Sequence, residues 1–116
     1  MKYLYIINEP PGHFAGLSEA GQQEIVGKYF ALRKNLEGSG DFIDGAALHA
    51  PKEAKSIRAS EGGQIVSDGP YAEAKEVLAG YYIVRAKDKH AAIEIAKEIQ
   101  ACNPSNHIVM RQVLEM

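Results

Sequence analysis

The sequence predicts an α+β protein of the ferredoxin-like type, with elements in the order β-α-β-(β-hairpin)-β-α-β. Three observations support this fold class. Two long stretches, 18–36 and 88–102, carry apolar residues at helical spacing. The segments 2–7 and 80–86 have the composition of strands that are apolar on both faces, and 55–67 has the pattern of a hairpin.

The composition fits one domain over residues 1–116. With 46% hydrophobic and 24% charged residues, the chain is not of the disordered class. A net charge of −2 argues against general binding of nucleic acid, which needs concentrated positive charge. No apolar run approaches the roughly 20 residues that span a bilayer, and no signal peptide follows Met1. We therefore expect a cytoplasmic protein with no membrane partner.

In the first half of the chain, KYLYII (2–7) predicts a strand, and 8–16 predicts a loop because it holds two prolines and two glycines. Ser18 is the expected N-cap of a helix that runs to about Leu36, and Gly38 and Gly40 end it. The buried stripe expected on this helix comprises Ile25, Val26, Tyr29, Phe30, Leu32 and Leu36.

The second half opens with an expected strand over 41–50, weakened by Gly45. Strands at 55–60 and 64–67 flank Glu61-Gly62-Gly63 and predict a hairpin that ends at 68–70. A short helix over 71–79, a strand over 80–86, a helix capped by Asp88 and a strand over 107–114 follow. The second long helix buries Ala92, Ile95, Ala96 and Ile99, and Asn103-Pro104 ends it.

The apolar character of both strand faces predicts a homodimer. Two helices cover only one face of the sheet, yet residues 2–7 and 80–86 place apolar side chains on the second face as well. The same sheet of a second copy, related by two-fold symmetry, is the simplest cover for that face.

The segment DGPYAEAKEVLAGYYIV (68–84) resembles the signature of the DGPF-domain proteins, a branch of the YCII-related superfamily. The resemblance extends to Tyr3-Leu4, Leu17-Ser18, Ile57-Arg58 and the final strand at 110–113, and so covers essentially the whole chain. It implies a ferredoxin-like subunit that pairs into a dimeric α+β barrel.

The resemblance implies no settled activity. Some YCII relatives are suspected enzymes because a His and an Asp line a cleft, and some DGPF domains occur near or fused to sigma factors. This chain departs from the family pattern at Tyr71, where Phe is usual, at Ala79, at Gln112 and in its 10–13 loop. These departures bear on any ligand preference rather than on the fold.

Asp68 is the leading candidate for chemistry, because Gly69-Pro70 constrains the backbone directly after it. A carboxylate held there can act as a general base or orient a histidine. It can equally brace its own turn through backbone N–H groups. Among the histidines, His49 is the first choice as its partner and His13 the second. No two of these residues have the local spacing of a metal site, so we expect no metal and no other cofactor.

Three further residues are candidates for ligand binding. Tyr71 and Lys75 share a face of the expected short helix and could bind an anion, although a solvated short helix is the commoner explanation for such a charge pattern. Tyr81 lies on a strand, where it either packs in the core or lines a small-molecule cavity. The lone Cys102 excludes an internal disulfide and is expected to be buried.

These features lead to two main hypotheses, besides a third, a purely structural or ligand-storage dimer. The first is a homodimer with a small-molecule cleft and acid–base activity carried by Asp68 and a histidine, with Tyr71 as a proton donor. The alternative is a non-catalytic regulatory or interaction module linked to transcription, associated with a sigma factor as in some similar proteins. The absence of a strong catalytic constellation keeps this alternative open.

Overall fold

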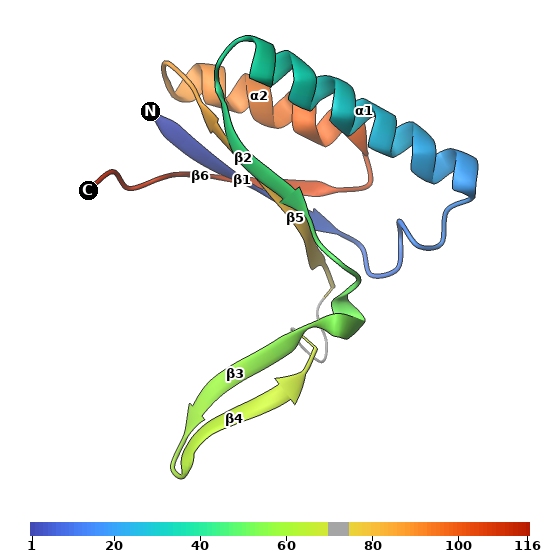
Figure 1. Cartoon of the computed structure of the whole chain (residues 1–116), viewed down its shortest axis with the longest axis vertical. Helices are drawn as coiled ribbons and strands as arrows, with labels where there is room; N and C mark the ends of the chain where they lie inside the picture. Colours follow the sequence, from blue (N-terminus) through green and yellow to red (C-terminus); the bar gives the residue numbers. More distant parts are fainter. Residues whose placement is uncertain (70–74) are drawn as a thin grey trace.

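A computed structural model describes residues 1–69 and 75–116 of the chain (Figure 1). The helices are α1 (Glu19–Gly38) and α2 (Lys89–Cys102), with a 3-10 turn η1 (Pro51–Glu53). The strands are β1 (Lys2–Glu9), β2 (Phe42–Ala47), β3 (Lys55–Ser60), β4 (Gly63–Asp68), β5 (Val77–Arg85) and β6 (His107–Gln112).

Four of these strands form an antiparallel sheet in the order β2-β5-β1-β6, and both helices lie against one of its faces (Figure 1). Strands β1 and β2 are joined through α1 and separated in space by β5, as in a split βαβ unit. The predicted ferredoxin-like α+β class is confirmed. Ser18 and Asp88 cap the two helices, because their side chains accept hydrogen bonds from the N–H groups of Gly21 and Ala91.

The core lies between the helices and the sheet. Alternate residues of β1, Tyr3, Tyr5 and Ile7, are buried against the helices. Tyr5 is fully buried, and its hydroxyl donates to the Ala92 carbonyl of α2 at 2.9 Å. The predicted inward stripe of α2 is confirmed, since Ala92 and Ile99 are fully buried. Close packing of these side chains therefore holds the sheet in one position relative to the two helices.

Strand β5 differs from the prediction. Residues 77–79, expected to end a short helix, are part of the strand, and residues 71–74 of that expected helix lie outside the described residues. Val77 and Leu78 pair with Glu9 and Asn8 of β1, so sheet pairing overrides the local helical propensity. The second strand is shorter than expected and ends at Ala47, and the last ends at Gln112.

The apolar stripe of α1 is only partly buried. Leu36 near its C-terminal end is buried, as predicted, but Val26 and Phe30 are 55% and 61% exposed, so their assignment to the core is wrong. The reason is geometric. The sheet strands do not fill the space beneath the middle of α1, from Ile25 to Arg33, and a cleft remains there.

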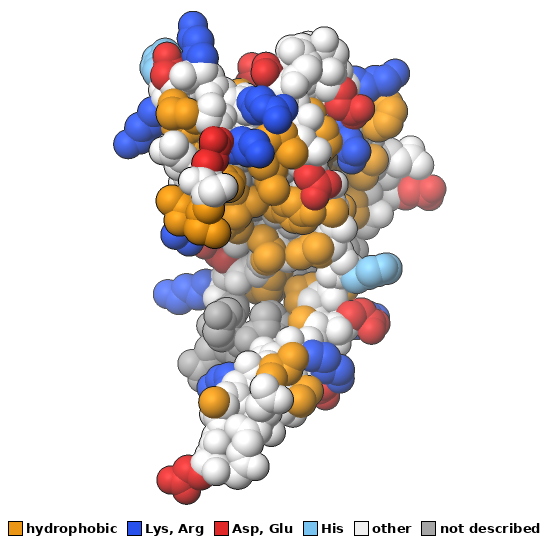
Figure 2. Space-filling model, turned by 60° about the vertical axis from the view of Figure 1, so that its left-hand side comes forward, with side chains coloured by type: hydrophobic (Ala, Val, Ile, Leu, Met, Phe, Trp, Pro, Cys, Tyr) orange, Lys and Arg blue, Asp and Glu red, His pale blue; other side chains and the backbone are white. Residues whose placement is uncertain are grey.

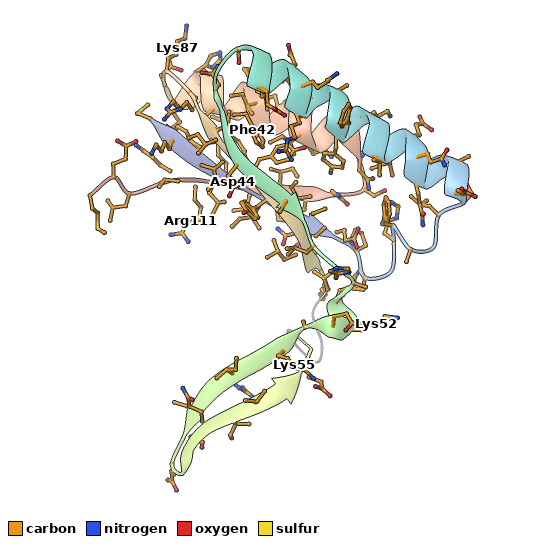
Figure 3. All side chains as sticks on the ribbon, viewed as in Figure 1. Phe42, Asp44, Lys52, Lys55, Lys87 and Arg111 are labelled. Atoms are coloured by element: carbon orange, nitrogen blue, oxygen red, sulfur yellow. The ribbon has the colours of Figure 1, made fainter. Side chains whose placement is uncertain are left out.

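Strands β3 and β4 form a separate two-stranded sheet, the hairpin predicted from 55–67, which projects from the body like an arm (Figure 1). We call residues 55–68 the arm. Lys52 of η1 and Lys55 of β3 mark its root (Figure 3). The molecule is consequently long and flat, with extents of 49 × 43 × 19 Å.

The sheet face opposite the helices carries Leu4, Ile6, Tyr81, Ile83 and Val109, all partly exposed. We call these five residues the open face. Asp44 on β2 and Arg111 on β6 lie in register with Ile83 and Leu4 and stand near its two edges (Figure 3). In the described part of the chain, neither helix has the length and apolarity to span a membrane.

Candidate ligand cleft

A cleft of about 470 Å³ lies beneath the middle of α1, which lines it from Ile25 to Arg33. Its walls come from the 10–17 loop, the end of β1, the ends of β2 and β5, and the start of η1. Segments far apart in the sequence therefore meet at this cleft. The cleft forms because α1 extends past the end of the sheet. Clefts of this volume are of the size that small organic ligands occupy.

Most of the lining is apolar. Phe30 and Val26 project from α1 into it, and Phe14, Leu48 and Leu78 come from the loop and the strand ends. Three of these, Val26, Phe30 and Leu78, are at least about half exposed, so the walls face solvent rather than one another. When a ligand covers apolar surface around a hollow, that surface leaves water and the free energy of the system falls.

Tyr82 forms part of the floor. Its ring packs edge-on against Tyr29 at 6.4 Å and Phe42 at 5.6 Å between centroids, and its hydroxyl donates to the Tyr29 carbonyl at 3.4 Å. Burial raises its pKa to about 12. Gly45 of β2 lies against this ring, where a Cβ would come within 2.5 Å of it. The floor is thus a fixed aromatic surface.

Buried Asn106 and partly buried Tyr29 both line the cleft and contact each other. The Asn106 side-chain N–H₂ donates to the Tyr29 hydroxyl at 3.2 Å. Burial raises the pKa of Tyr29, and the bond from Asn106 acts in the opposite direction. Within residues 1–69 and 75–116 the Asn106 Oδ1 is buried with no hydrogen-bond partner. This orphaned acceptor is costly, because a buried unpaired oxygen forfeits its hydration.

Glu9 is the acidic residue in the lining. It ends β1, on the same side of the strand as Ile7, so its carboxylate lies on the helix side of the sheet. Partial burial raises its pKa above the ordinary value of 4.5, and the charge of His13 acts in the opposite direction. A carboxyl group with a raised pKa beside an apolar wall is suited to exchange a proton with a bound molecule.

Basic groups stand at the rim. His49 is exposed and lines the cleft after β2. Arg33 also lines it, with its guanidinium 4.6 Å from the centroid of Phe42 and a hydrogen bond at 3.0 Å to the Glu37 carboxylate. The charged and titratable groups that line the cleft therefore include the carboxyl of Glu9, the imidazole of His49 and the permanently protonated guanidinium of Arg33.

The structure does not bring Asp68 to a histidine within one chain. Asp68 is the last residue of β4, its side chain is 84% exposed, and it forms an ion pair with Lys55, which lies directly opposite in the register. Throughout the described ranges no hydrogen bond joins Asp68 to His13 or His49. His49 reaches the cleft, whereas His13 sits on the loop after β1, and its backbone N–H donates to the Pro10 carbonyl.

The remaining candidates do not meet at one place. Tyr71 lies outside the described residues. Lys75 is exposed just before β5. Tyr81 lies on the open face, where its hydroxyl donates to the Asp44 carboxylate at 2.9 Å, and this bond raises its pKa. Neither Lys75 nor Tyr81 lines the cleft.

Sequence reasoning missed Glu9, Tyr29 and Asn106. The available signal for Glu9 was its position, since it directly follows a two-faced apolar strand and precedes the Pro-Gly loop. Tyr29 was assigned to the helix stripe, and nothing in the sequence relates it to Asn106, 77 residues away. An exposed contact between His107 Nδ1 and Glu76, at 3.0 Å, was also not expected. No group of three potential metal ligands occurs among the residues that the structure describes.

Comparison with known proteins adds two findings. The family model of the YCII-related domain matches residues 1–116. A curated relative, the "Uncharacterized protein R00369" of Rhizobium meliloti (strain 1021), is 30% identical over 88 residues. That match spans 76% of this chain and 71% of the relative.

Proposed function

The chain belongs to the YCII-related domain family, and from this premise we propose that it is a homodimer that binds a small, largely apolar molecule in the cleft beneath α1. The observation that carries the proposal is the exposure of Phe30 and Val26 on the wall of that cleft. An amphipathic helix normally buries such residues. Here they face a hollow of ligand size.

The lining also indicates the class of ligand. An aromatic or branched aliphatic body matches the walls formed by Phe14, Phe30 and Tyr82. One polar group, such as a hydroxyl or an amine, matches the Glu9 carboxyl at the end of β1. A strongly charged or sugar-like molecule would leave many polar groups unpaired against these walls.

Any acid–base activity belongs more naturally to Glu9 than to Asp68. Glu9 has a raised pKa and lines the cleft, and His49 supplies a second titratable group at the rim. Asp68 is engaged with Lys55, so it takes part only if a second copy brings a histidine to it. We propose proton transfer by Glu9 to or from the polar group of the ligand as the chemistry of this site.

The homodimer is supported by the open face. Its five residues are apolar or aromatic, and none of the described elements of the same chain covers them. Asp44 and Arg111 stand near opposite edges of this face, so a two-fold axis can place Asp44 of each copy beside Arg111 of the other. An Ile83→Asp variant is therefore expected to be monomeric.

A regulatory or interaction module linked to transcription is the second candidate. The observation that favours it is the exposed arm, which offers apolar side chains to another protein. In that case the cleft would bind an effector rather than a substrate. The two functions differ in whether the bound molecule leaves the cleft chemically changed.

The cleft is tested by titration with N-phenyl-1-naphthylamine, a neutral apolar dye whose fluorescence rises when it leaves water. Phe30→Ala removes exposed wall. If about 200 Å² of a phenylalanine side chain is accessible in full and 61% of it remains exposed, covering half of that exposed part is worth about 1.5 kcal/mol. The expected result is a roughly tenfold weaker Kd.

Leu114→Ala is the matched control, since Leu114 is an exposed aliphatic residue outside the cleft. It should leave the Kd unchanged. Equal affinity in the Phe30 variant and the wild type, at unchanged melting temperature, would exclude the cleft as the binding site. For the chemistry, Glu9→Gln should abolish turnover of a ligand identified by thermal-shift screening while its binding is retained.

A further inference from the structure

The arm is a hairpin without internal cover. Its six residue pairs run from Lys55 opposite Asp68 to Ser60 opposite Gly63, and both strands are edge strands. Ile57 and Val66 lie directly opposite each other and are 62% and 65% exposed. Figure 2 shows hydrophobic side chains on the surface of the projecting arm, among polar ones.

Such a hairpin does not hold its shape well alone. Isolated two-stranded hairpins are marginally stable in water and need a third strand or a packed apolar face. Exposed edges and apolar pairs also favour association with another chain. In residues 1–69 and 75–116, no element of the body packs on either face of the arm, so a partner chain is a candidate source of stabilising contacts.

The solvent-accessible area of the chain can be compared with the area expected for a compact monomer of the same mass. A compact monomer of 12.6 kDa is expected to expose about 6,200 Å² and to have a radius of gyration of about 13.4 Å. The chain exposes 8106 Å² with a radius of gyration of 16.0 Å. The excess solvent-accessible area is about 1,900 Å² per chain, or about 3,800 Å² for two chains. That total lies within the range that obligate homodimers bury.

We infer that the arm is a dimerisation arm, which packs the face bearing Ile57, Val66 and Ala59 onto a second copy of this chain. This inference rests on the proposed homodimer and extends it. A dimer through the open sheet face alone leaves the arm projecting, whereas an arm that reaches the other copy also covers the exposed apolar pair at 57 and 66. A second copy fits because the unburied area matches that of a homodimer interface.

One face of the arm is selected by its side chains. Ile57, Val66 and Ala59 share a face, on which the Lys55–Asp68 ion pair closes the root. The other face carries Arg58 opposite Ile65, with serines at 56 and 67. Ile65 therefore provides a matched control on the same hairpin.

The test measures the dimerisation constant by sedimentation equilibrium for the wild type, Val66→Asp and Ile65→Asp. Placing an unpaired charge in a packed contact is expected to weaken the dimer at least about tenfold in Val66→Asp. Ile65→Asp should change the constant less than about threefold. In the wild type, hydrogen exchange at amides of residues 55–68 should slow as protein concentration rises.

Each failure has a distinct reading. A wild type that remains monomeric, with Ile83→Asp behaving the same, overturns both the homodimer and the arm. A dimer lost in Ile83→Asp but unchanged in Val66→Asp, with exchange at residues 55–68 independent of concentration, overturns the arm alone and leaves it to a different protein. Equal loss in Ile65→Asp and Val66→Asp overturns the assignment of the face.

Discussion

Replacing Gly45 by alanine should destabilise the protein through the floor of the cleft. A Cβ at this position would stand 2.5 Å from Cδ1 of Tyr82 and 3.0 Å from the Tyr81 carbonyl oxygen. The Tyr82 ring has little room to move, since it is buried between Tyr29 and Phe42. Overpacking of this kind costs about 1–3 kcal/mol.

The corresponding change in melting temperature follows from the chain length. An unfolding entropy of about 2.1 cal/mol/K per residue over 116 residues makes 1 kcal/mol worth about 4 °C. Gly45→Ala should therefore lower Tm by about 4–12 °C. Circular dichroism at a fixed protein concentration measures this, and the fixed concentration keeps any dimer contribution constant.

Gly27→Ala is the matched control, because a Cβ added at Gly27 in α1 would meet open space, with none of the described residues beyond its own helical turns within 4 Å. It should raise Tm by about 2–4 °C, since alanine is favoured over glycine in a helix by about 0.5–1 kcal/mol. A Gly45→Ala protein as stable as the wild type, alongside a stabilised Gly27→Ala protein, would show that the Tyr82 ring yields and that the floor is not rigid.

Three further predictions concern charge, capping and thiol chemistry. Because burial raises the pKa of Glu9 above 4.5, its ionised form is disfavoured in the fold, so Glu9→Gln should stabilise the protein near neutral pH. That gain should shrink as pH falls through the raised pKa and disappear below about 4, which chemical denaturation at several pH values would detect; a gain that grew in acid would contradict the sign. Asp88→Ala should cost about 0.5–2 kcal/mol by removing the acceptor 2.8 Å from the Ala91 N–H, whereas a urea midpoint equal to that of the wild type would mean that the cap contributes nothing. The Cys102 thiol is buried, donates to the Glu98 carbonyl and has a pKa raised by burial, so Ellman's reagent should label it slowly in buffer and rapidly in urea; equal rates would contradict its burial.

Prediction from sequence succeeded where local pattern and packing agree. The two-residue period of β1 places Tyr3, Tyr5 and Ile7 on one face, and the 3.6-residue period of α2 identifies buried Ile99. It failed for residues 77–79, which belong to β5, where Val77 and Leu78 pair with β1. It also failed for Val26 and Phe30, since periodicity shows which side of a helix is apolar and not how far a sheet extends beneath it.

The site was less predictable than the fold. Asp68 was chosen because the turn after it is constrained, and the structure gives it Lys55 as a partner through the register of the arm. Of the three catalytic candidates chosen from the sequence, Asp68, His49 and His13, His49 alone lines the cleft. Tyr29 and Asn106 meet across 77 residues, a contact that no local pattern encodes.

The amino-acid sequence by itself determined the order of elements, the helix caps at Ser18 and Asp88, and the presence of two apolar sheet faces. These are local properties, set by periodicity and by hydrogen bonds over three or four residues. The tertiary structure alone decided which apolar side chains form core and which line the cleft around Glu9. That division depends on where strands end relative to the helix above them, and so on contacts between segments distant in the chain.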